Sequence, residues 1–234
     1  MLNDRQLQIL GAIIQEYVAT AEPVASKIIV DKYGFDISPA TVRNDMVFLE
    51  EAGLLRQPHT SAGRVPTEDG YRLFLERFVR SKDTGRVSQP LRKSLEGYTQ
   101  PQDQMRQLAK SLSELTGQAA LMAVDSTWNY YTGLSQLMEN PEFANVAVLK
   151  EFSKAVDRMD EVMVDVFADT SKEMNVWLGD ENPFGHDLAT LLVRYRLPGG
   201  QIGIIGLIGP QRMDYERNMQ LLEQAKDLLN EDEE

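Results

Sequence analysis

The sequence predicts an α+β protein made of two domains. Amphipathic helical spacing dominates the first 80 residues, whereas the later part adds apolar segments of strand length to its helices. The charge balance also changes along the chain: residues 1–93 hold 13 Lys and Arg against 12 Asp and Glu, and the remainder holds 11 against 24. Such asymmetry marks separate domains. We expect an N-terminal domain at 1–80, a linker at 81–90 and a second domain at 91–234.

The composition narrows the class of protein. The 234 residues are 42% hydrophobic and 26% charged, which is typical of a folded chain. There is no cysteine, which excludes disulfides, thiolate metal sites and cysteine nucleophiles and favours a reducing cytoplasm. Residues 1–5 lack a signal-peptide pattern, and the longest apolar run, 202–208, is far shorter than the ~20 residues that span a bilayer. We expect no membrane segment.

Two helices open the N-terminal domain. The first is predicted at about 4–20, where apolar residues recur on one side of a helix, and Pro23 ends it. A short second helix follows at about 25–33, and Gly34 makes a turn. The residues on the apolar side of the first helix are Leu7, Leu10, Ile14, Tyr17 and Val18.

A third helix begins at a strong start signal. Ser38 is the expected N-cap, Pro39 occupies the first helical position, and Gly53 marks the end. Asp45 falls within the opening turns. The buried stripe comprises Val42, Met46 and Leu49.

The hydrophobic period then changes to that of a short ribbon. Residues 54–57 and 64–66 predict two strands around the loop 58–63, and Thr67 caps a fourth helix that runs to about Phe78. Three helices followed by a two-stranded ribbon is the order of a winged helix-turn-helix.

The second domain is predicted to combine helices with an antiparallel sheet. Pro198, Gly199 and Gly200 form a hairpin signal between two long apolar strands. The expected elements are a helix at 91–116 interrupted at Pro101, a strand at 119–124, a helix within 141–163, a strand at 162–167, strands at 188–197 and 201–208, and a final helix from Tyr215 to Leu229.

The outward face of the third helix is the sharpest functional feature. Opposite the buried stripe lie Ala40, Asn44 and Val47, with Thr41 and Arg43 on the flanks. A recognition helix needs small side chains that allow close approach, together with an amide and a guanidinium that read base edges. A solvated helix face, with Arg43 paired to a neighbouring acid, fits this segment equally well.

The ribbon loop favours nucleic acid. It supplies hydroxyls, open backbone and cationic character without any acid, as a wing that touches phosphates or the minor groove requires. A polar hairpin turn is the simpler alternative, but it is less expected directly after a capped helix of this kind. The loop residues concerned are His59, Thr60, Ser61, Gly63 and Arg64.

Several segments together resemble the HrcA family of heat-inducible transcription repressors. The N-terminal ones are 17–24 (YVATAEPV), 38–45 (SPATVRND), 57–67 (QPHTSAGRVPT) and 70–72 (GYR). Others follow in the family's order, at 131–134 (YTGL), 141–143 (PEF), 180–183 (DENP) and 209–215 (GPQRMDY). These matches are long, ungapped and specific.

The resemblance implies a repressor of chaperone genes that binds an inverted-repeat operator in double-stranded DNA as a homodimer. It also implies that a GAF-like domain follows the winged helix and that the GroE chaperonin modulates activity. Arg43 and Asn44 would contact bases or adjacent phosphates, and Ser38 and Thr41 would anchor the helix N-terminus on the backbone. The wing contact would come from His59, Thr60, Ser61 and Arg64.

The chain departs from the family in one respect. Members of the family usually carry a dimerising segment inserted within the GAF-like part. Here residues 123–128 run almost directly into 130–133, so most of that segment is absent. The departure leaves the mode of dimerisation open, and the candidates are the α+β domain and the helices after Leu91.

Enzyme and cofactor chemistry are weakly supported. His59 and His186 lie far apart with no ligand-spaced partner, so we expect no metal, no cofactor and no catalytic centre. Asp157, Asp160 and Glu161 fit a solvated helix face. Gly203, Gly206 and Gly209 lack the following helix of a phosphate loop and fit close packing better.

A sensing adaptor is the remaining alternative, because a GAF-like fold can hold a small ligand and some winged helices bind proteins. No basic cluster or chromophore cysteine supports a ligand, and Trp128 and Trp177 fit the core or an interface. A protein-binding wing should expose apolar residues, whereas this one exposes hydroxyls and Arg64.

Overall fold

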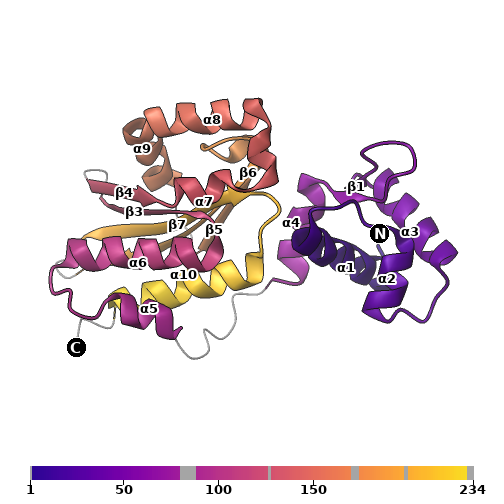
Figure 1. Cartoon of the computed structure of the whole chain (residues 1–234), viewed down its shortest axis with the longest axis horizontal. Coiled ribbons are helices and arrows are strands. Elements are labelled where there is room, and N and C mark those ends of the chain that lie inside the picture. Colours follow the sequence, from indigo (N-terminus) through magenta and orange to yellow (C-terminus); the bar gives the residue numbers. More distant parts are fainter. Residues whose placement is uncertain (1, 80–87, 126–127, 170–173, 198–199, 231–234) are drawn as a thin grey trace. The chain divides into compact units, whose positions relative to one another are not determined.

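The computed structural model describes residues 2–79, 88–125, 128–169, 174–197 and 200–230. The chain divides into two compact units, Met1–Arg80 and Ser81–Glu234, and Figure 1 shows the elements of each. Most of the predicted linker, residues 81–87, lies outside the described residues. Gln89 and Pro90, which were also assigned to the linker, instead open a helix.

The first unit has the predicted order of elements. It consists of α1 (Asp4–Thr20), α2 (Ser26–Tyr33), α3 (Pro39–Glu51), β1 (Leu55–Arg56), β2 (Val65–Pro66) and α4 (Glu68–Arg77). Its core is built from fully buried side chains of the three leading helices, such as Ile13, Ile29 and Leu49, and from Tyr71 and Phe74 of α4. Burial of these apolar side chains holds the helices together.

The start of each long helix in this unit follows from local hydrogen bonds. Asn3 and Gln6 form a capping box at α1, Ser38 caps α3, and Thr67 accepts a hydrogen bond from the backbone N–H of Gly70 at α4. Pro39 stands at the first helical position of α3. The sequence predicted the caps of α3 and α4 because caps act within three residues, whereas the start of α1 was predicted from its apolar period.

The two-stranded ribbon of the first unit is extended by a backbone bridge to the segment before α2. Leu55 pairs with Pro66 and Arg56 with Val65. Val24, which precedes α2, pairs with Arg64 through two backbone hydrogen bonds of 2.9 Å. We call residues 55–66 the wing. Its return strand is therefore joined to the segment that leads into α2.

The second unit is built on a five-stranded antiparallel sheet in the order β4-β3-β7-β6-β5. The strands are β3 (Ala119–Val124), β4 (Trp128–Thr132), β5 (Met174–Leu178), β6 (Leu188–Arg196) and β7 (Ile202–Pro210). Alternate residues of each strand face opposite sides, so the central strands, which are buried on both faces, are apolar almost throughout.

Helices cover both faces of this sheet (Figure 1). One face carries α6 (Pro101–Thr116) and α10 (Tyr215–Asn230), with α5 (Gln89–Ser94) packed on α6. The other carries α7 (Leu134–Met138), η1 (Pro141–Ala144), α8 (Val146–Asp157) and α9 (Met159–Asp169), and η2 (Gly179–Glu181) follows β5. This confirms the expected α+β class with an antiparallel sheet.

One predicted strand is wrong. Residues 162–167 belong to α9, where Met159, Met163 and Val166 are buried at helical spacing and Val164 is 56% exposed. A short continuous apolar run fits a buried strand and a buried helix equally, and here the helical period prevails. The edge strands β4 and β5 were not predicted, because their partly exposed residues lack a clear apolar pattern.

The glycines of β7 allow close packing against β6. A Cβ atom at Gly203 would lie 2.1 Å from the ring of Tyr195, and one at Gly206 would lie 2.3 Å from Cδ2 of Leu192. These distances are too short for any side chain. The preferred sequence interpretation of these glycines is therefore confirmed. Burial in this packing raises the pKa of Tyr195, whose hydroxyl donates to Sδ of Met105.

Two kinds of feature are absent from the described residues. No helix among them is long and apolar enough to cross a bilayer. No group of three or more His, Cys, Asp or Glu side chains among them could hold a metal ion. His186 contacts Asp180 at 3.0 Å between Nδ1 and Oδ1, and both side chains are exposed.

Candidate nucleic-acid interface

Helix α3 presents the polar face that the sequence predicts. The N–H of Thr41 donates to Oγ of Ser38 at 3.1 Å, and the two hydroxyl oxygens lie 3.0 Å apart. Val42, Met46 and Leu49 are buried. The helix therefore directs Ala40, Arg43, Asn44 and Val47 to its exposed side.

Arg43 and Asn44 are uncommitted within the described part of the chain. Neither side chain makes a hydrogen bond or ion pair with another described residue, and both are exposed. The alternative in which Arg43 pairs with a neighbouring acid is thus not found among these residues. A free guanidinium beside a free amide can donate to phosphates and to base edges.

The tip of the wing is exposed and polar. His59, Thr60 and Ser61 are all exposed, and the loop is closed by a hydrogen bond from the N–H of Ala62 to the carbonyl of His59. The side-chain amide of Gln57 also donates to the carbonyl of Ala62 at 3.0 Å. Ser61 has a φ of 85°, so the turn uses left-handed backbone at a residue other than glycine.

Arg64 lies at the base of the wing and is already paired. Its Nη2 lies 2.8 Å and its Nε 2.9 Å from Oε2 of Glu50, and the side chain is only 14% exposed. Glu50 belongs to the last turn of α3. The guanidinium therefore joins the wing to α3, a pairing that the sequence did not predict.

A hollow of about 380 Å³ separates α3 from the wing, and we call it the α3–wing hollow. It brings Arg43 and Ser61 to one surface, whereas Ser38, Thr41, Asn44, His59 and Thr60 do not line it. Its lining comprises Val24, Ala25, Ser26, Arg43, Met46, Val47, Gln57, Ser61, Ala62, Gly63 and Arg64.

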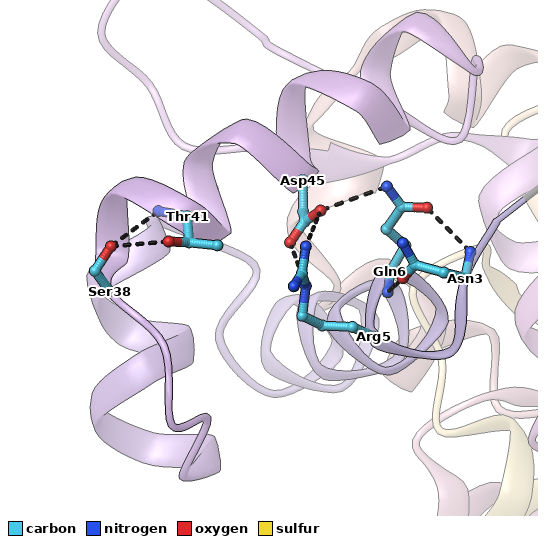
Figure 2. A network of polar contacts seen from close by, with 6 residues as sticks. All are labelled: Asn3, Arg5, Gln6, Ser38, Thr41 and Asp45. Carbon is cyan, nitrogen blue, oxygen red and sulfur yellow. Dashed lines mark hydrogen bonds and ion pairs between the residues drawn. The ribbon is translucent and has the colours of Figure 1, made fainter.

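A polar network fixes α3 against α1, as Figure 2 shows. The carboxylate of Asp45 accepts from Nε of Arg5 at 2.9 Å and from Nη2 at 3.2 Å, and Nε2 of Gln6 lies 3.4 Å from the same carboxylate. Gln6 is itself part of the capping box with Asn3. The position of Asp45 in the opening turns of α3 was predicted, but its role in this network was not, because Arg5 lies 40 residues away.

A second buried carboxylate joins α1 to α2. Glu16 accepts from Nζ of Lys32 at 2.6 Å and from the hydroxyl of Tyr33 at 3.0 Å. The hydrogen bond from Lys32 lowers the pKa of Glu16, while burial raises the pKa of Tyr33 to about 12. The contribution of Glu16 to stability is therefore present near neutral pH and is lost as the pH falls through its lowered pKa.

Replacing Asp45 by alanine is expected to destabilise the first unit by about 1–3 kcal/mol, because it leaves Arg5 and Gln6 without their buried acceptor. Arg5 is half exposed and can be hydrated again, which keeps the effect below that of a fully buried pair. Hydrogen exchange of α1 and α3 amides in the full chain measures the loss. Asp36→Ala, which removes an exposed carboxylate, is the control, and equal protection in the two variants would contradict this role.

Two family profiles match the chain, and they meet at residues 64–67. A profile of the HrcA protein C-terminal domain matches residues 64–219, which is most of the chain. The chain belongs to the HrcA family. A DeoR-like helix-turn-helix domain profile matches residues 8–67 and covers α1 to the wing.

Named HrcA relatives are similar to large parts of the chain. The heat-inducible transcription repressor HrcA of Thermosynechococcus vestitus is 35% identical over 222 residues, which is 92% of this chain and 59% of that protein. The HrcA protein of Cutibacterium acnes is 45% identical over 126 residues, or 52% of this chain and 36% of that protein. The chain thus spans between about a third and three fifths of the length of these relatives.

One solved structure has the same fold along nearly the whole chain. It is a hypothetical protein at 19% identity with a TM-score of 0.79, and the match covers 99% of this chain and 98% of that one. At this identity the likeness shows the fold alone.

Proposed function

We propose that this chain is a transcription repressor of heat-shock genes that binds duplex DNA through α3 and the wing. The observation that carries the proposal is the outward face of α3, where Arg43 and Asn44 are exposed and make no hydrogen bond or ion pair with other described residues. Membership of a family whose named relatives are heat-inducible transcription repressors supports the biological role.

The proposed contacts divide between bases and backbone. Arg43 and Asn44 reach base edges or adjacent phosphates in the major groove, and Ser38 and Thr41 hold the helix N-terminus on the backbone. His59, Thr60 and Ser61 contact the flanking backbone or minor groove from the wing. Arg64 acts with them by keeping the wing against α3, since its guanidinium is paired with Glu50.

We further propose that the protein acts as a homodimer on an inverted repeat, in the cytoplasm and without catalytic activity. An inverted repeat offers two equivalent half-sites, and a two-fold symmetric dimer can place one winged helix on each of them. The second unit supplies the dimer surface in this proposal. The family resemblance also suggests the GroE chaperonin as a partner.

Selection of random duplex DNA on the purified full-length chain tests the proposed function. The expected result is a recovered sequence with two related halves in opposite orientation. A recovered pool with no sequence preference, and no measurable binding to any duplex, would overturn it.

The Arg64–Glu50 pair predicts opposite effects of two substitutions on binding to all duplexes. Arg64→Ala leaves the Glu50 carboxylate unneutralised and should weaken binding regardless of sequence, whereas Glu50→Gln frees a cation and should steepen the log–log salt dependence by up to about 1. Binding isotherms at several salt concentrations measure both. Lys110→Ala, an exposed cation of α6, is the control. An unchanged slope and affinity in both test variants would exclude the wing base from the interface.

A further inference from the structure

Val47 is an exposed apolar side chain beside the uncommitted side chains of Arg43 and Asn44. It is 39% exposed, follows Arg43 by four residues and Asn44 by three, and so shares their side of α3. It also lines the α3–wing hollow together with Arg43 and Ser61. Its position was recognised from the helical period, but the function proposed above does not use it.

We propose that Val47 determines base specificity by packing against the C5-methyl group of a thymine in the major groove. This inference rests on the proposed DNA binding and adds one residue to those that contact bases. Thymine is the only base that presents a methyl group in that groove, and apolar side chains recognise it by direct contact.

The residues around Val47 favour a thymine as the group that it contacts. The free donors of Arg43 and Asn44 lie about one helical turn before it, so a partner that covers all three side chains must offer hydrogen-bond acceptors beside a small apolar group. A base-pair step in the major groove has that pattern, since thymine places its O4 acceptor beside its methyl group. An apolar protein surface would leave both donors unsatisfied.

The side chain itself suits a fixed contact. Valine has one strongly preferred χ1 rotamer in a helix, so its two methyl groups are already placed before binding and little rotamer freedom is lost. The proposed thymine lies next to the base pair that Asn44 contacts, because Val47 is one helical turn further along the same face.

Phe48 provides a matched control on the same helix. It is 41% exposed, nearly as much as Val47, and it follows Asn44 by four residues, but it does not line the α3–wing hollow and points about 100° away from Val47 around the helix axis. Truncating it removes exposed apolar surface from α3 without removing the proposed contact.

The test replaces each thymine of the selected duplex, one at a time, by uracil, which removes only the methyl group. In the wild-type chain and in Phe48→Ala, one thymine in each half-site is expected to weaken binding about three- to fivefold when changed, as the loss of one buried methyl group implies. In Val47→Ala the same change is expected to have no effect. Circular dichroism confirms that each variant is folded.

Two results would overturn the inference. If Val47→Ala keeps the full uracil effect at every position, another residue reads the methyl group. If no thymine is sensitive in the wild-type chain, there is no methyl contact. Both results leave the proposed function intact, whereas failure of the chain to bind any duplex would overturn that function itself.

Discussion

A duplex that carries both halves of the selected repeat is expected to bind the full-length chain about 10²- to 10⁴-fold more tightly than a duplex with one half. One winged helix makes a small interface, in the range of roughly 600–1,000 Å², and few phosphate contacts. When two copies are joined, the second contact becomes intramolecular and its effective concentration replaces the free concentration. The gain therefore requires no new contact.

The dimer is expected to form through the region beyond residue 90, where the second unit has its own core. Sedimentation should show the full chain as a dimer and residues 1–80 as a monomer, and binding to the full repeat should be cooperative near the dimer dissociation constant. A chain that remains monomeric at high concentration, and binds one half-site and the whole repeat equally, would contradict this prediction.

The second large effect concerns sequence recognition. Asn44→Ala should weaken binding to the selected duplex by about 1–3 kcal/mol, or roughly five- to 150-fold, and leave binding to unrelated duplexes nearly unchanged. The reason is that a base-edge contact is lost while the phosphate contacts remain. Competition between the selected and a scrambled duplex measures the difference.

The control for this substitution is Gln8→Ala, which removes an exposed amide from α1. Both variants should unfold within about 0.5 kcal/mol of the wild-type chain, since neither amide lies in the core. A large loss of stability in Asn44→Ala alone would mean that its amide supports the fold. Equal weakening on selected and scrambled DNA would mean that Asn44 contacts the backbone only.

Local rules predicted much of the fold. The bounds of α1 and β3 follow from periodicity and capping, as does the burial of the α10 face, because these signals act between neighbouring residues. The segment 162–167 was misassigned because its apolar residues are consecutive, and only packing against the sheet distinguishes helix from strand there. The edge strands β4 and β5 were not predicted, because their own partly exposed residues lack a clear apolar pattern.

The difference between local signals and tertiary contacts also explains which features of the candidate interface were predicted. The outward direction of Asn44 and Val47 follows from the stripe of Val42, Met46 and Leu49 within one helix. The partners of Arg64 and Asp45 lie 14 and 40 residues away in the sequence, so these pairs form only through tertiary contacts. A charge count alone could not separate the paired Arg64 from the uncommitted Arg43.

Protection of guanine N7 atoms in the selected duplex tests the central claim most directly, because N7 lies in the major groove where α3 is proposed to bind. The account predicts protection in both halves of the repeat with the full-length chain, and its loss with the Arg43→Ala, Asn44→Ala double variant at a concentration where backbone binding persists. Protection that is absent in the wild-type complex, or unchanged in the double variant, would contradict a recognition role for α3.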